Sequence, residues 1–166
     1  MTSTKSNLNP LTTILEQKRR KKMTAELEDV KINVKIKLSA LWVALMFLYL
    51  YNDLFTFFRA DHIEEVLTGE VAGIQITQVF LLGAAILMAI PIFMVFLSLT
   101  LKAKVNRWTN IIVGIFHAVV LLASLLVPGE LWANYAFYMI LEAVFIALIV
   151  WTAWKWPKQE RGEVTP

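Results

Sequence analysis

Four long apolar stretches, separated by polar segments, constrain this sequence more than any other feature. They cover about residues 38–58, 76–101, 108–127 and 131–154. Each is about 20 residues long or longer, the length at which a helix crosses the ~30 Å hydrocarbon core of a bilayer. The sequence therefore predicts an all-α integral membrane protein, in which four transmembrane helices form one antiparallel bundle over residues 38–154.

The basic residues predict the orientation of this bundle. All but one of the 16 Lys and Arg residues lie in an N-terminal tail (residues 1–37), a connector (102–107) and a C-terminal tail (155–166). Short basic segments are retained on the cytoplasmic side during insertion, so we predict that both termini lie inside. The exception, Arg59, falls in an acidic outer loop, residues 59–73, which glycines interrupt.

Two further patterns agree with this arrangement. Tryptophans gather at the predicted inner ends of the spans, where indole rings form an interfacial belt; they are Trp42, Trp108, Trp151, Trp154 and Trp156. Short connections predict that the second and third helices, and the third and fourth, are antiparallel neighbours. Small residues four apart would let the last two approach closely; they are Gly114 with Ala118 and Ala143 with Ala147.

Composition limits the other classes of protein. The chain is 58% hydrophobic and 17% charged, against about 25% charged residues in soluble domains, so no second folded domain is expected. With no cysteine, disulfides, thiolate metal sites and lipidation on Cys are excluded. The positive charge lies beside the spans, where topology and anionic lipid headgroups at the cytoplasmic face explain it without nucleic acid. The tail of residues 1–37 is predicted to be partly disordered or an interfacial helix.

Two ionisable side chains fall near the middle of the bilayer. His117 and Glu142 lie midway along the third and fourth stretches, which run in opposite directions, so they reach similar depth. A charge there costs roughly 2.5–3.5 kcal/mol on insertion scales, so Glu142 must be protonated, paired or facing water. His117 is one available partner. The pair would serve as an interhelical hydrogen bond, or alternatively as a proton-accepting pair or substrate contact.

Asp53 is a second candidate, outward of the midpoint of the first stretch. It is interpreted as an interfacial carboxylate that reaches headgroup water or bonds a neighbouring helix. The alternative is a polar vestibule above His117 and Glu142, lined by Asp53, Asn52, Gln75 and Gln78. Pro91, in the second stretch, is expected to kink its helix, because it frees the carbonyl of Leu87; that carbonyl would then only adjust packing or face a cavity.

Motifs of enzymes are absent from the sequence. It contains no Gly-rich phosphate loop, nucleophile elbow or metalloprotease motif. Asp61, His62 and Glu65 are spaced for one helical face, but a solvated acidic loop is the preferred interpretation. A haem would depend on His117 alone within the spans. We therefore predict a protein that is not an enzyme, with no catalytic residue, cofactor or metal.

Three segments resemble a family of small bacterial four-helix membrane proteins classed as a domain of unknown function. They are LWVALMFLYLYNDLF from residue 41, IPIFMVFLSLTLKAKVNRWTNII from residue 90 and EAVFIALIVWTAWKWP from residue 142. The likeness covers roughly residues 28–158. It implies a multi-pass protein of the bacterial inner membrane and supplies no activity, ligand or catalytic residue.

The leading hypothesis for function is a non-enzymatic membrane subunit or scaffold, whose buried polar residues join helices or a partner chain. One alternative is a small proton-coupled transporter or conduit that uses Glu142, His117 and Asp53. Against it, no inverted repeat is visible and the chain is short for alternating access. The other alternative is a protein that binds quinone or lipid in a cavity opened at Pro91. Homo- or hetero-oligomerisation is compatible with all three.

Overall fold

The computed structural model describes residues 11, 13–15, 31–127 and 130–157. Contacts divide the chain into two units, Met1–Lys31 and Ile32–Pro166. In the first unit, the described residues 11 and 13–15 are helical and exposed. The predictions of a partly disordered or interfacial tail over residues 1–37, and of a C-terminal tail over residues 155–166, fall mostly on residues outside the described ones; of the first tail, residues 34–37 are described and are helical.

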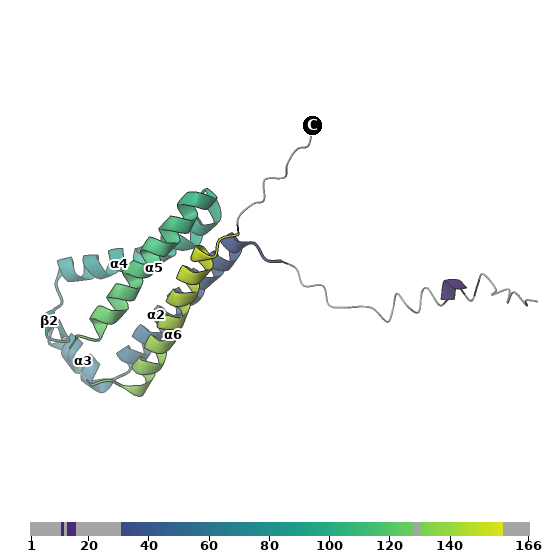
Figure 1. Cartoon of the computed structure of the whole chain (residues 1–166). Coiled ribbons are helices and arrows are strands. Elements are labelled where there is room, and N and C mark those ends of the chain that lie inside the picture. The colour runs from purple at the N-terminus through teal and green to yellow at the C-terminus, as the bar shows by residue number, and fades with distance from the viewer. Residues whose placement is uncertain (1–10, 12, 16–30, 128–129, 158–166) are drawn as a thin grey trace, which may run out of the picture. The chain divides into compact units, whose positions relative to one another are not determined.

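Within the described part of the second unit, four helices are long and apolar enough to cross a membrane (Figure 1). They are α2 (Val34–Phe57), α4 (Gln78–Thr100), α5 (Ala103–Ser124) and α6 (Ala133–Trp154). The predicted all-helical architecture is therefore confirmed. The first and third helices begin before the predicted residues 38 and 108, because helical hydrogen bonding continues through lysines and arginines that hydropathy assigns to loops.

The predicted outer loop is itself structured. It contains the helix α3 (Ala60–Leu67) and a short antiparallel hairpin of β1 (Glu70–Val71) and β2 (Ile74–Gln75). Gly69 and Gly73 have φ angles of +83° and +75°, in the left-handed region that glycine adopts without a Cβ clash. The two predicted breaks thus fall before the hairpin and at its turn.

The helix α2 is the main packing element of the bundle. It packs along both α4 and α6, and α5 packs along α6. The predicted proximity of α5 and α6 is confirmed. The same prediction for α4 and α5 holds only near their connection at Leu101 and Lys102, from which the two helices diverge (Figure 1). A short connection brings two helix ends together, but the side chains decide whether the helices stay in contact.

Buried residues along α2 and α6 alternate in spacings of three and four. In α2 this series is Leu38, Trp42, Leu45 and Asn52, with the half-buried Tyr49 completing it; Ser39, next to Leu38, is also buried. In α6 they are Met139, Glu142, Ile146, Ile149 and Ala153. A mean spacing of 3.5 residues is typical of helices that pack at a small crossing angle over a long seam. Polar side chains thus occupy positions of the core seam itself.

Packing of α4 changes at Pro91. Pro91, Met94 and Ser98 are buried, whereas Val79 and Ile86, nearer the start of the helix, are 80% and 58% exposed. The helix continues through the proline, which removes one backbone hydrogen bond from the turn before it. The half of α4 before Pro91 therefore contributes little to the core, and the predicted kink at this residue stays a prediction.

Gly114 lies where α5 meets α6. A Cβ atom built on it would be 2.7 Å from Cγ2 of Val150 and 3.7 Å from Cγ2 of Ile149. The close approach predicted at Gly114 is therefore present. The close approach predicted at Ala143 and Ala147 of α6 is wrong, because both alanines are exposed. The buried residues of α6 lie on another face of the helix, so both alanines point outward.

We expect Gly114→Ala to lower the free energy of unfolding by about 1 kcal/mol or more, because the new methyl group would overpack a stiff β-branched neighbour. Gly83→Ala in α4 is the matched control, since nothing lies within 4 Å of its added Cβ. It should be neutral, or more stable by up to about 1 kcal/mol from helix propensity. Unfolding of both purified variants in one detergent measures this. Equal effects would contradict the close contact.

Candidate functional site in the interior of the helix bundle

Four polar side chains from three helices gather midway along the bundle. Tyr49 and Asn52 come from α2, His117 from α5 and Glu142 from α6; we call these four the middle cluster. Asn52, His117 and Glu142 are only 7%, 2% and 4% exposed. Tyr49, one turn before Asn52 on the same face of α2, is half-buried at the edge of the cluster. These side chains therefore face the bundle interior.

Hydrogen bonds in the middle cluster connect α2 to both other helices. The hydroxyl of Tyr49 and Nδ1 of His117 share a hydrogen bond of 3.1 Å, and their rings stack with centroids 5.8 Å apart. The edge of Trp42 contacts the same imidazole, also with centroids 5.8 Å apart. Nδ2 of Asn52 donates to Oε1 of Glu142 at 3.3 Å. The histidine and the carboxyl group are thus each held by α2.

The structure does not join His117 to Glu142 by a hydrogen bond or an ion pair; both are among the described residues. Both do lie in the interior, which the sequence left open for Glu142. From depth, His117 was the available partner of Glu142, whereas α2 presents Tyr49 and Asn52 to the same interior. Partner choice depends on the rotation of three helices, which depth alone does not supply.

Two buried polar atoms of the middle cluster have no hydrogen-bond partner among the described residues. They are Nε2 of His117 and Oδ1 of Asn52. Buried polar atoms are usually satisfied, and leaving one unpaired costs about 1–3 kcal/mol. The cluster therefore retains both donor and acceptor capacity beyond what its own contacts use.

The other predicted site residues lie outside this cluster. Asp53 is exposed, although its neighbour Asn52 is buried. Nε2 of Gln75, in the hairpin, donates to Oε1 of Glu70 at 3.0 Å, and Gln78 is the exposed first residue of α4. Of the proposed vestibule, only Asn52 meets His117 or Glu142 through a contact between described residues. Pro91 lies buried on α4 and takes no part in the cluster.

A second group of polar residues, which the sequence analysis did not single out, joins three helices nearer the end at which α4 and α5 connect. We call it the inner cluster; it comprises Trp42, Ser98, Asn106 and Asn110, all fully buried. Nε1 of Trp42 and Oγ of Ser98 donate to Oδ1 of Asn110, at 2.7 and 3.3 Å. Nδ2 of Asn106 donates to the carbonyl of Ser98 at 2.6 Å. Thus α2, α4 and α5 are bonded together.

Trp42 corrects one prediction. It was assigned to an interfacial belt, but its ring is enclosed by the bundle and its N–H is used in the inner cluster. Trp108, Trp151 and Trp154 are exposed, as residues of such a belt would be. Asparagines four apart on one helix, Asn106 and Asn110, were the available sequence sign of a shared polar face.

Basic side chains surround this end of the bundle. Nζ of Lys35 donates to the carbonyls of Leu99 and Leu101, at 3.2 and 2.7 Å, where it satisfies groups at the C-terminus of α4. The guanidinium of Arg107 lies 5.8 Å from the ring centroid of Trp154. The ammonium group of Lys35 thus bonds α2 to α4 outside the inner cluster.

The acidic loop forms a local ion-pair network. Arg59 bonds the carboxylate of Asp61, and this hydrogen bond holds the pKa of Asp61 below its ordinary value. Arg59 also lies 4.3 Å from the ring centroid of Trp132, which attaches the loop to the start of α6. His62 and Glu65 approach within 4.0 Å. Among the described residues, no group of three His, Cys, Asp or Glu side chains is placed to hold a metal ion.

We expect Trp42→Phe to lower the free energy of unfolding by about 1–2 kcal/mol, because it removes the N–H that Asn110 accepts within the membrane-length region. Trp108→Phe is the matched control, since this ring is 50% exposed. Its effect should stay within about 0.5 kcal/mol. Denaturant unfolding in one detergent compares the two. A control as destabilised as Trp42→Phe would argue against the inner cluster as a specific contact.

A family model matches most of the length of this chain. Residues 26–163 match the model of a family of unknown function, DUF6326. No characterised protein and no solved structure matches the chain. The matched segment contains all four long helices and both polar clusters, so the resemblance to an uncharacterised family is confirmed. The chain belongs to this family of unknown function, DUF6326.

Proposed function

We propose that this chain is a multi-pass protein of the bacterial inner membrane, with both termini in the cytoplasm, that acts as a non-enzymatic membrane subunit or scaffold. The observation that carries this proposal is the direction of its buried polar side chains. Asn52, His117 and Glu142 face inward and bond helices of the same chain. Such bonds hold a bundle together in a medium that offers the helices no hydrophobic driving force.

The separation of the two clusters supports a structural role over a conduit. Between them along the seams lie Leu45, Gly114 and Ile146, which present no polar side-chain atom. Trp42 touches both clusters, but its indole N–H is a donor only and is given to Asn110. A chain of donors and acceptors that could pass a proton along the bundle is therefore interrupted at this residue.

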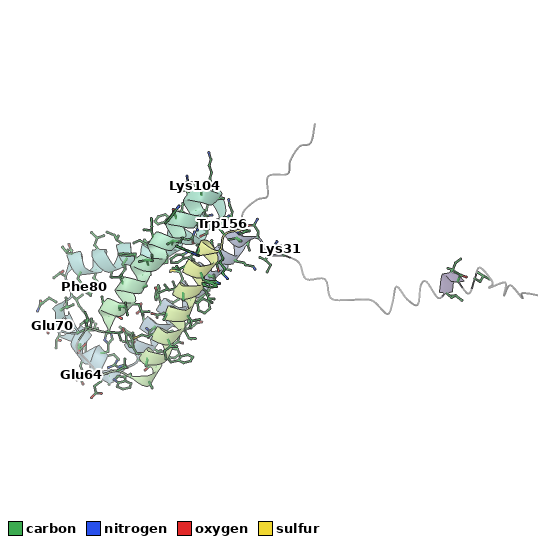
Figure 2. The ribbon with its side chains drawn as sticks, viewed as in Figure 1. Lys31, Glu64, Glu70, Phe80, Lys104 and Trp156 are labelled. Atoms are coloured by element: carbon green, nitrogen blue, oxygen red, sulfur yellow. The ribbon has the colours of Figure 1, made fainter. Side chains whose placement is uncertain are left out.

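Charge at the two ends of the helices supports the orientation. Figure 2 shows Lys104 and Trp156 at one end and Glu64 and Glu70 at the other. The end with Lys104 also carries Lys35, which bonds the C-terminus of α4. The positive-inside rule assigns the basic end to the cytoplasm. There, anionic lipid headgroups are the partner that basic residues beside a membrane attract.

The orientation can be tested in a native background, because the chain has no cysteine. We expect Glu64→Cys, exposed on α3, to react with an impermeant maleimide in intact cells whose outer membrane has been permeabilised. Lys104→Cys, exposed at the other end, should react only after the inner membrane is opened. The cysteine-free parent controls for background. The reverse pattern would contradict the proposed topology.

Glu142 distinguishes a structural role from transport. We expect Glu142→Gln to keep stability within about 1 kcal/mol, because an amide oxygen can still accept from Asn52. Glu142→Leu should lose about 1–3 kcal/mol, since it leaves the Asn52 amide unpartnered. Unfolding of the three proteins measures this. A leucine variant as stable as the wild type would argue against the structural role.

The same proteins can be reconstituted into liposomes loaded with a pH-sensitive dye. We expect proton flux to equal that of protein-free liposomes for the wild type and for both Glu142 variants. Flux that requires the carboxylate, present in the wild type and lost in Glu142→Gln, would replace the scaffold proposal by a proton-coupled transporter.

A further inference from the structure

The middle cluster has more hydrogen-bonding capacity than its four side chains use. They share two hydrogen bonds, while Nε2 of His117 and Oδ1 of Asn52 are enclosed and unpartnered. In a bundle surrounded by lipid, such atoms cannot reach solvent along the helix exterior, so leaving them unpaired is costly. A contact that served only to join helices would need neither atom. Their presence points to a third hydrogen-bonding species.

The chemistry of the unpartnered atoms defines that species. Oδ1 of Asn52 is an acceptor, so it requires a donor. Nε2 of His117 is a donor or an acceptor, according to the tautomer that the Tyr49 hydrogen bond selects. A molecule that both donates and accepts satisfies both atoms with either tautomer. An anion, and a ligand with only carbonyl oxygens, would not satisfy Oδ1, and a cation would not satisfy Nε2 when that nitrogen carries the proton.

The enclosure of the cluster defines its size. Asn52, His117 and Glu142 are each more than nine-tenths buried. The rings of Trp42 and Tyr49 contact the imidazole from two directions. A buried water molecule typically makes about three hydrogen bonds to polar groups of this kind. Water is the smallest molecule with the required donors and acceptors, so the enclosure of these side chains favours it over a larger ligand.

We propose that the middle cluster is a binding site for water inside the bundle, at which water molecules donate to Oδ1 of Asn52 and pair with Nε2 of His117. Water held here supplies the hydrogen bonds that the four side chains leave unmade at mid-bundle. This inference rests on the proposed membrane location but not on the scaffold role, which concerns what the whole chain does.

Radiolytic hydroxyl-radical labelling in ¹⁸O-water tests the site on the full chain in lipid nanodiscs. Radicals formed from bound water oxidise side chains beside it. Two buried methionines provide a matched pair of probes with the same intrinsic reactivity: Met139 lies one turn from Glu142, and Met94 is buried on α4 away from the middle cluster. We expect ¹⁸O incorporation at Met139 and Tyr49 several times faster than at Met94. Equal, slow labelling of all three would overturn the proposal.

Variants separate bound water from solvent that reaches Met139 by another route. Asn52→Leu removes Oδ1, the unpartnered oxygen, and should lower the rate of ¹⁸O incorporation at Met139 toward the rate at Met94. Ser39→Ala is the control, because it removes a hydrogen bond of the same helix outside the cluster, to the carbonyl of Val95. If Asn52→Leu fails to fold, His117→Phe removes the orphan nitrogen instead. Labelling that persists unchanged in a folded cluster variant would overturn the proposal.

Discussion

The hydrogen bonds that α2 makes to the three other long helices are the interactions on which the rest of the structure depends. Trp42 reaches α5, Ser39 and Lys35 reach α4, and Asn52 reaches Glu142 of α6. Helices in lipid gain no hydrophobic free energy by associating, so in the membrane that we propose for this chain, directional bonds and close packing must hold the helices in register. The buried face of α2 is therefore the element that fixes the rotation of its neighbours.

Close packing supplies what hydrogen bonds do not. Gly114 lets α5 approach Val150 of α6, and the seam of α6 continues through Ile146 and Ile149. In contrast, α4 joins the core only from Pro91 onward, through Met94 and Ser98. In the bundle, α5 thus packs along α6, α6 along α2 and α2 along α4, while Trp42 and Tyr49 bond α2 to α5.

The two polar clusters make different use of this packing. In the inner cluster, Ser98 and both asparagines exchange hydrogen bonds with one another and with Trp42, which suits a fixed joint between helices. In the middle cluster, His117 and Asn52 each keep an unpartnered atom. A fully satisfied network rigidifies a core, whereas spare hydrogen-bonding capacity needs a further partner. The second arrangement is therefore where we expect a bound species.

Much of the architecture could be predicted from the sequence, because length and hydropathy act along one chain segment at a time. The four spans, the basic and acidic ends, and the similar depth of His117 and Glu142 all follow from local composition and position along the helices. The starts of the helices were less predictable, since backbone hydrogen bonding continues through Lys104 and Arg107 where hydropathy ends.

The sequence by itself determined where the four long helices lie, how deep each polar residue lies along its helix, and the family to which the chain belongs. Only the tertiary structure decided which polar residues meet: Glu142 with Asn52 rather than His117, and Trp42 with Asn110 rather than with lipid headgroups. Depth is a property of one helix. Contact depends on the rotation and neighbours of several helices at once, and these are fixed by packing across the whole bundle.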